Sequence, residues 1–228
     1  MNSAPETSPD PSETMTERRP PLDTTPFTLN LDPARLDAPL SWPDIFGDGR
    51  PVELEVGSGK GLFLANAGQA RPEHNFLGIE ISRKYANKAA ERIAKLKLAN
   101  VKMYSGDARL FLARAVPSAS LRAVHVYFPD PWWKARHKKR RVFCEPLVAD
   151  VERCLEPGGE LWVATDVEEY YGVIRELVAD HPRFEEQSFP AVTAPEHDHD
   201  YLTNFERKYR IEGRPIYRAL YRLQRGPA

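Results

Sequence analysis

Residues 52–61 read VELEVGSGKG and indicate the class of fold to which the chain belongs. The first five form a short apolar segment typical of a buried strand, and the rest form a glycine-rich turn. Residues 62–70, LFLANAGQA, then have the apolar spacing of a helix. A strand, a tight turn and a helix in this order form the opening unit of a nucleotide-binding α/β fold.

The spacing of the glycines indicates the class of ligand. A dinucleotide-binding turn prefers G-x-G-x-x-G, whereas Gly57, Gly59 and Gly61 form G-x-G-x-G, with Glu55 two residues before the first glycine. A carboxylate at that position would repel a pyrophosphate and favour a cation. S-Adenosylmethionine carries a sulfonium and an amino group, so we expect Glu55, Gly57 and Gly59 to bind this cofactor. The alternative for the glycines alone is a tight turn with no ligand.

A second strand and helix follow the glycine turn. The strand is predicted over residues 75–79 and ends at Glu80, and Ser82 is a candidate N-cap for a helix over 83–98. Glu80 follows Gly61 by nineteen residues, the separation at which an acid accepts hydrogen bonds from both hydroxyls of a ribose. An isolated glutamate at a strand end is more often solvated or a cap. With the glycine turn in front of it, Glu80 is expected to bind the ribose.

Asp107 follows a third predicted strand over residues 101–104. Its carboxylate could accept a hydrogen bond from the exocyclic amine of an adenine. It could also cap the helix predicted over 108–115. The two roles do not exclude each other.

The remaining pattern completes an α/β domain. Residues 157–159, PGG, are expected to stop the chain before a fifth strand over 160–164, which ends beside Asp166 and precedes a helix over 167–179. The alternation of residues 216–224 indicates a final antiparallel strand. We therefore expect an α/β fold with a mostly parallel sheet, an antiparallel C-terminal strand and helices on both faces.

Residues 128–141 read FPDPWWKARHKKRR and fall between a predicted strand over 121–127 and a helix-like segment over 142–155. In open α/β sheets, ligands bind at such loops beyond the carboxyl ends of the strands. Prolines on both sides of Asp130 restrict the backbone and hold its carboxylate in one direction. Asp130 is therefore the candidate catalytic residue, oriented toward a planar base. The alternative is a proline-rich turn before a solvated helix.

Positive charge is concentrated in two short segments. Residues 145–200 hold fifteen acidic residues against three Lys or Arg, whereas residues 207–225 hold seven basic residues against Glu212. The loop after Asp130 adds six cations that would attract phosphates. This distribution favours selective binding of a polyanion. The candidate RNA-binding residues of the loop are Arg136, His137, Lys138, Lys139, Arg140 and Arg141, with Lys134 just before them.

Composition predicts a disordered tail over residues 1–26 and one domain over 27–228, because the tail is rich in Pro, Ser, Thr and Glu. No apolar run resembles a signal peptide or a membrane span, so a soluble cytoplasmic protein is expected. Cys144 and Cys154 indicate neither a disulfide nor a metal site. His197 and His199 alternate with aspartates, but such loop residues usually face solvent, and no metal is expected.

Five motifs together resemble the bacterial tRNA (guanine-N7)-methyltransferase family over residues 54–223. They are EVGSGKG from Glu55, GIE at 78–80, FPDPWxKxRHxKRR from Phe128, TD at Thr165 and TxFE at Thr203. The resemblance implies a Rossmann-like fold, S-adenosylmethionine as cofactor, and methylation of the guanine at position 46 of the tRNA variable loop. One departure is Trp133, where many members carry proline.

The resemblance also implies residue roles. Cofactor contacts fall on Glu55, Glu80, Asp107 and Asp130, and tRNA backbone contacts on residues 136–141. Substrate contacts fall on Lys134, Asp166, Thr203, Asn204, Phe205 and Glu206, the last four in a polar loop that could close over a base.

Three other classes of protein share part of this pattern. Another RNA or small-molecule methyltransferase would share the glycines, but a small substrate has no use for six cations beside the loop. A nicotinamide oxidoreductase would need longer glycine spacing. A non-catalytic RNA-binding protein leaves the acids at the strand ends without a role. A monomer and a homodimer both remain open.

Overall fold

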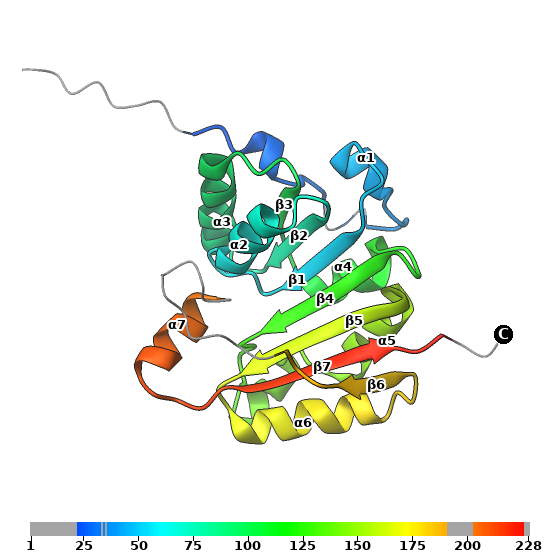
Figure 1. Ribbon diagram of the computed structural model, residues 1–228, viewed down its shortest axis with the longest axis vertical. Helices are drawn as coiled ribbons and strands as arrows, with labels where there is room; N and C mark the ends of the chain where they lie inside the picture. The colour runs from blue at the N-terminus through cyan, green and yellow to red at the C-terminus, as the bar shows by residue number, and fades with distance from the viewer. Residues whose placement is uncertain (1–21, 33, 35, 191–202, 226–228) are drawn as a thin grey trace, which may run out of the picture.

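The computed structural model describes residues 22–32, 34, 36–190 and 203–225. Within them, seven strands form one sheet in the order β3-β2-β1-β4-β5-β7-β6 (Figure 1). Strands β1 to β5 run parallel, whereas β7 runs antiparallel to both β5 and β6. The strands are β1 (Val52–Val56), β2 (Asn75–Glu80), β3 (Val101–Ser105), β4 (Leu121–Tyr127), β5 (Leu155–Thr165), β6 (Phe184–Gln187) and β7 (Tyr217–Leu223).

Helices cover both faces of the sheet and bury its central strands on both sides. Every residue of β1 and β2 is buried, as expected for a parallel sheet between two helical layers. On one face, α2 (Leu62–Ala70) and α3 (Arg83–Leu96) enclose one apolar cluster. On the other face, α4 (Ala108–Ala115), α5 (Glu145–Cys154) and α6 (Glu168–Ala179) enclose the larger cluster (Figure 1). The predicted fold class is confirmed.

The segment before β1 packs against the domain. It contains the 3-10 turn η1 (Thr25–Phe27) and the short helix α1 (Trp42–Phe46). The backbone N–H of Leu29 donates to the carbonyl of Met103 at 2.7 Å, and the buried Trp42 side chain donates to Ser120 Oγ at 3.1 Å. Residues 1–21 of the predicted tail lie outside the described residues.

The fifth strand begins earlier than predicted. Proline and two glycines at 157–159 are expected to end the preceding segment, yet β5 runs from Leu155. The register with β4 instead shifts within this stretch, so the glycines form an irregularity inside the strand. Gly158 has φ +87°, and a Cβ on Gly159 would lie 2.9 Å from the carbonyl oxygen of Glu156. Glycine therefore allows the backbone to bulge without breaking the pairing on either side.

Two helix boundaries also differ from the prediction. Helix α5 begins at Glu145 rather than 142, since the basic segment before it forms the 3-10 helix η3 (Ala135–Arg140). Helix α3 ends at Leu96 rather than 98, because Lys97 adopts a left-handed conformation with φ 54°. Both free cysteines belong to α5 or its cap. No helix in the described part of the chain is long and apolar enough to cross a bilayer.

Candidate active site

A cavity of about 920 Å³ lies at the carboxyl ends of β1 to β4 and extends to α7 (Asn204–Ile211). Figure 1 shows α7 beyond the arrowheads of β4 and β5. This is the edge at which open α/β sheets bind ligands. Eight of the residues singled out from the sequence line the cavity: Gly57, Gly59, Glu80, Asp107, Asp130, Lys139, Arg140 and Phe205.

The glycine turn has the shape that a closely bound ligand requires. Gly57 and Gly59 have φ of +78° and +54°, and the space where a Cβ would project is open at both. At Gly61 a Cβ would lie 2.8 Å from the Cβ of Ala89 on α3. Two glycines therefore leave room on the cavity side, while the third allows the turn to pack against a helix.

Glu80 is positioned by two backbone hydrogen bonds. Its Oε2 accepts from the N–H of Gly59 at 2.9 Å, and its Oε1 accepts from the N–H of Ser82 at 2.8 Å. Ser82 is the N-cap residue of α3, but its side chain makes no capping bond. Because a carboxylate has about four acceptor positions, each Glu80 oxygen can still accept a ribose hydroxyl.

Glu55 lies beneath the glycine turn and is 3 % exposed. Burial raises the pKa of its carboxyl to about 8, and the negative charge of Glu80 acts in the same direction. A hydrogen bond from Ser58 acts in the opposite direction and lowers the pKa. Among the described residues, its Oε2 has no hydrogen-bond partner. A buried acid next to an open glycine cradle is suited to a cationic ligand, so the residues present fit S-adenosylmethionine.

Cofactor affinity should therefore depend on the ionisation of Glu55. If the cation binds the carboxylate form, the dissociation constant should rise roughly tenfold for each pH unit below about 8, because a proton must leave first. Calorimetric titration with S-adenosylhomocysteine and sinefungin between pH 6 and 8 would measure this. Glu55→Gln should bind more weakly with a flat pH profile. A flat profile in the parent would contradict the assignment.

Asp107 caps a helix and also lines the cavity. As N-cap of α4, its Oδ1 accepts from the N–H of Arg109 at 2.9 Å, which confirms the cap. Its Oδ2 accepts from the Arg109 guanidinium at 3.3 Å. The residue also lines the cavity, so an oxygen can accept a further bond from an adenine amine.

The turn that carries Asp130 has a strained backbone. Phe128 and Trp132, on either side of the Pro-Asp-Pro segment, have φ of 52° and 42°. Such conformations cost non-glycine residues about 1–3 kcal/mol each and concentrate at functional sites. Neighbouring groups hold the turn in place: Arg141 Nε donates to the carbonyl of Pro131 at 2.7 Å, and the Arg140 guanidinium lies 5.1 Å from the Trp132 ring. Asp130 itself is exposed at the cavity wall.

The basic loop divides into exposed and structural cations. Lys139 and Arg140 are exposed and line the cavity, and Arg136 is exposed on η3. Arg141 is partly buried, with its guanidinium 4.9 Å from the Tyr170 ring and bonded to the turn. Lys134 is exposed outside the cavity lining. His137 contacts Trp132 edge-on at 5.6 Å, and the side chain of Lys138 is not described.

Residues 203–206 begin a helix and do not form the predicted loop. Thr203 is the N-cap of α7, and its Oγ1 accepts from the N–H of Glu206 at 3.0 Å. Thr-x-x-Glu is the capping-box spacing, so this signal was present in the sequence. Glu206 is 2 % exposed and accepts from Arg218 at 2.6 Å, whereas Phe205 is 51 % exposed and lines the cavity. The side chain of Asn204 is not described.

Asp166 lies outside the cavity lining and accepts a hydrogen bond from Arg214. The Arg214 guanidinium stacks 4.2 Å from the ring of Tyr209 on α7. Burial and the charge of Asp166 raise the pKa of Tyr209. Asp166 is thus connected to the cavity through α7.

Several cavity residues were not identified from the sequence. Their only signal was their position near the end of a predicted strand, which many solvated residues share. Ile81 is 75 % exposed, directly after Glu80. The Lys60 ammonium lies 5.9 Å from the ring of Tyr85. The residues missed include Lys60, Ile81, Tyr85, Arg109 and Tyr127.

The described residues contain no cluster of three or more His, Cys, Asp or Glu suited to a metal ion. The alternating segment with His197 and His199 lies outside them.

The fold is one that solved methyltransferases share. The aminoglycoside resistance methyltransferase NpmB1 shares the fold with a TM-score of 0.56 at 18 % identity, over 86 % of this chain and 95 % of that one. The antibiotic-resistance methyltransferase Kmr shares the fold with a TM-score of 0.55 at 16 % identity, over 88 % of this chain and 96 % of that one.

Sequence relatives specify the family. A family described as "Putative methyltransferase" matches residues 49–219. A tRNA (guanine-N(7)-)-methyltransferase of Rhodopirellula baltica is 45 % identical over 85 % of this chain and 76 % of its own length. A tRNA (guanine-N(7)-)-methyltransferase of Geobacter metallireducens is 34 % identical over 86 % of this chain and 92 % of its own length. The chain belongs to the tRNA (guanine-N(7)-)-methyltransferase family.

Proposed function

We propose that this protein transfers a methyl group from S-adenosylmethionine to N7 of a guanine in tRNA, at position 46 of the variable loop. The observation that carries this proposal is one cavity shared by two kinds of group. On one side are the glycine turn and Glu80, and on the other are the exposed Asp130 and two cations, Lys139 and Arg140. The names of the relatives supply the base and the class of RNA.

The reaction needs alignment more than proton transfer. Guanine N7 has a free lone pair, so no base has to remove a proton before attack. Bound S-adenosylmethionine supplies the methyl group as an electrophile. Holding two reactants in line is worth roughly 7 to 11 kcal/mol. The rigid cavity of this chain is suited to that role.

Asp130 orients the base in this mechanism. Its carboxylate accepts hydrogen bonds from the amide and amine edge of guanine and stabilises the positive charge that develops on the base. Adenine also has an N7 acceptor but lacks these donors, so the same carboxylate selects guanine. Phe205, 51 % exposed at the cavity, offers an aromatic face for stacking.

The remaining roles follow from the placements described above. Glu55, Gly57, Gly59, Glu80 and Asp107 hold the cofactor, and Asp166 and Glu206 position α7 rather than contact the base. Residues 27–228 act as one methyltransferase domain in the cytoplasm, as a monomer or a homodimer.

The direct test is transfer of a labelled methyl group to unmodified tRNA, followed by nucleoside analysis. We expect 7-methylguanosine, and its loss when guanosine 46 of the transcript is replaced by adenosine. Label in another nucleoside, or label that persists in the altered transcript, would contradict the proposed substrate position. Titration that showed NAD binding and no S-adenosylmethionine binding would contradict the cofactor.

The exposed cations should determine the salt dependence of tRNA binding. Arg136→Ala with Lys139→Ala should weaken binding and lower the slope of log K against log salt by about one for each phosphate that is no longer neutralised. Arg175→Ala with Arg183→Ala is the matched control, since it removes equal charge from the far end of the domain near β6. If both double variants gave the same slope of log K against log salt, the loop cations would face solvent and would not contact tRNA phosphates.

A further inference from the structure

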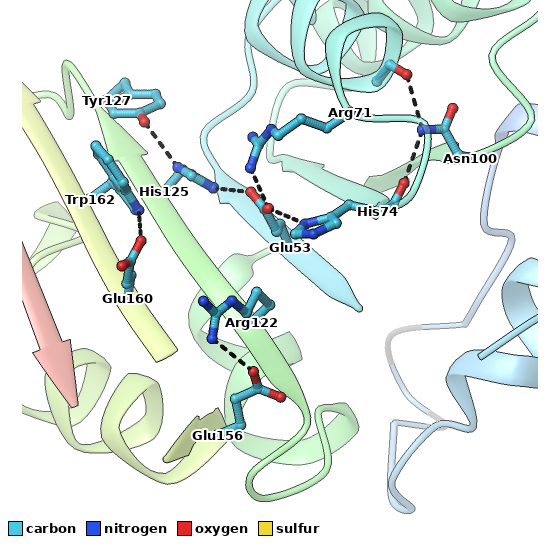
Figure 2. A network of polar contacts seen from close by, with 11 residues as sticks. Glu53, Arg71, His74, Asn100, Arg122, His125, Tyr127, Glu156, Glu160 and Trp162 are labelled. Atoms are coloured by element: carbon cyan, nitrogen blue, oxygen red, sulfur yellow. Dashed lines mark hydrogen bonds and ion pairs between the residues drawn. The ribbon is translucent and has the colours of Figure 1, made fainter. Parts of the chain in front are cut away.

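A chain of polar side chains runs through the buried face of the sheet between β1, β4 and α2. Figure 2 shows Glu53 at its centre, on β1. Glu53 Oε2 lies 2.7 Å from His125 Nε2, and His125 Nδ1 lies 2.9 Å from the Tyr127 hydroxyl. Glu53 Oε1 contacts Arg71 and lies 2.6 Å from His74 Nδ1. Glu53, His125 and Tyr127 are 1 %, 3 % and 6 % exposed.

The protonation states of Glu53, His125 and Tyr127 determine which atom donates in each of the hydrogen bonds between them. Burial raises the pKa of Glu53, yet His125, Arg71 and His74 outweigh it and lower the pKa to about 2. Burial lowers the pKa of His125 despite Glu53, and raises that of Tyr127. At neutral pH the Tyr127 O–H therefore donates to Nδ1 of a neutral imidazole, whose Nε2–H donates to the Glu53 carboxylate.

Stability alone is a weak reason for this arrangement. Buried charged and polar groups are costly to desolvate, and an apolar set of similar volume often serves the fold equally well. Aromatic side chains pack against this chain, and Phe63 contacts the rings of both His125 and Tyr127 at 4.6 and 5.1 Å. The chain of hydrogen bonds instead gives the Tyr127 ring a single orientation.

Tyr127 connects this chain to the active site. It is the last residue of β4, it lines the cavity, and Phe128 next to it has a left-handed backbone. The hydroxyl points to His125 (Figure 2), so the side chain of this cavity residue is held on the buried side of the sheet. Tyr127 therefore lies where β4 leads into the turn of Asp130, three residues further along, and β4 pairs with β1, which leads into the glycine turn.

We propose that the Arg71–Glu53–His125–Tyr127 chain is a positioning device for methyl transfer. It holds the Tyr127 ring, and through it the turn of Asp130, so that the base meets the methyl group in line. Tyr127 and His125 are positioning residues and take no part in proton transfer to the substrate. The inference rests on the proposed function, but part of its test needs no catalysis.

Tyr127→Phe keeps the ring and removes the one hydrogen bond. The single-turnover rate at saturating cofactor and tRNA should fall about tenfold, the scale of one intramolecular hydrogen bond. The dissociation constant for S-adenosylhomocysteine should change by less than about threefold, because Tyr127 acts through the turn of Asp130 and does not anchor the cofactor. A rate within about twofold of the parent would overturn the proposal.

A pair of substitutions at the next residue tests the mechanism of positioning. His125→Gln retains a donor for Glu53 and an acceptor for Tyr127, whereas His125→Leu retains neither. The glutamine variant should keep the rate within about threefold, and the leucine variant should lose about tenfold, as Tyr127→Phe does. Equal rates in the two variants would overturn the proposal. If the leucine variant does not fold, Tyr127→Phe decides.

Two further measurements separate positioning from general stability. Trp162→Phe is the control, since it removes the bond from Trp162 Nε1 to Glu160 at 3.0 Å beside His125 without touching Tyr127. Its rate should equal that of the parent. Nitrogen NMR of the cofactor-free protein should show His125 as the neutral Nε2–H tautomer. A charged His125 ring at pH 7, or the Nδ1–H tautomer, would overturn the assigned hydrogen bonds. This measurement does not depend on whether the protein methylates tRNA.

Discussion

Asp130→Asn should lower the single-turnover methylation rate about a hundredfold or more, the effect of removing one preorganised electrostatic group. Asparagine keeps the size of the side chain and the proline-flanked turn. It removes the charge that stabilises the methylated base, and it points a donor at the guanine donors. Affinity for tRNA should change little, because exposed cations such as Lys139 supply most of it.

The measurement uses saturating cofactor and tRNA, so that weaker binding does not appear as slower chemistry. Asp180→Asn, which changes another aspartate at an exposed position after α6, is the control and should react like the parent. A rate within about threefold of the parent would assign Asp130 to the structure of the turn. Asp166 would then be the next candidate, since its pair with Arg214 lies beside α7.

Glu206→Ala should release α7 from the domain. Glu206 is 2 % exposed and bonds to Arg218 at 2.6 Å and Arg210 at 3.2 Å. Removing one member of a buried ion pair typically costs about 3–5 kcal/mol, because the partner charge is left without compensation. Methylation should fall as well, since Phe205 and Lys208 of the same helix line the cavity.

Native-state hydrogen exchange of residues 204–211 measures this loss directly. The free energy of opening of α7 should fall by about 3 kcal/mol, while the amides of β1 and β4 remain protected. Glu212→Ala is the control, because Glu212 is exposed and its oxygens lie 3.8 Å from Lys208 and Arg214. It should cost less than about 1 kcal/mol. Similar exchange in the two variants would show that Glu206 does not hold the helix.

Much of the fold could be predicted because its signals are local. The apolar runs predict β1, β2 and β4, and the residues after Gly61 predict α2 with its observed bounds. The predicted boundary of β5 is wrong, since Gly158 and Gly159 can either end a segment or bulge within a strand. Only the neighbouring β4 decides between these outcomes.

Much of the candidate site could also be predicted from the sequence. Gly57, Gly59, Glu80, Asp107 and Asp130 could be found because each follows a strand, and parallel strands bring their ends to one edge. The polarity of the run from Thr203 favours a loop, whereas its capping box predicts the helix that the structure contains. Composition alone is misleading there, because the local hydrogen-bonding pattern decides the conformation.

The sequence by itself determined most of the strands and helices, the glycine turn, the strand-end acids and the family. These depend on backbone preferences and on spacings within one strand, turn and helix. Tertiary structure alone decided which polar side chains meet. Glu53 bonds to His125, 72 residues away, because β1 lies next to β4, and Glu206 is buried by Arg218 because β7 returns antiparallel to β5. Strand order brings these partners together, and no local pattern encodes it.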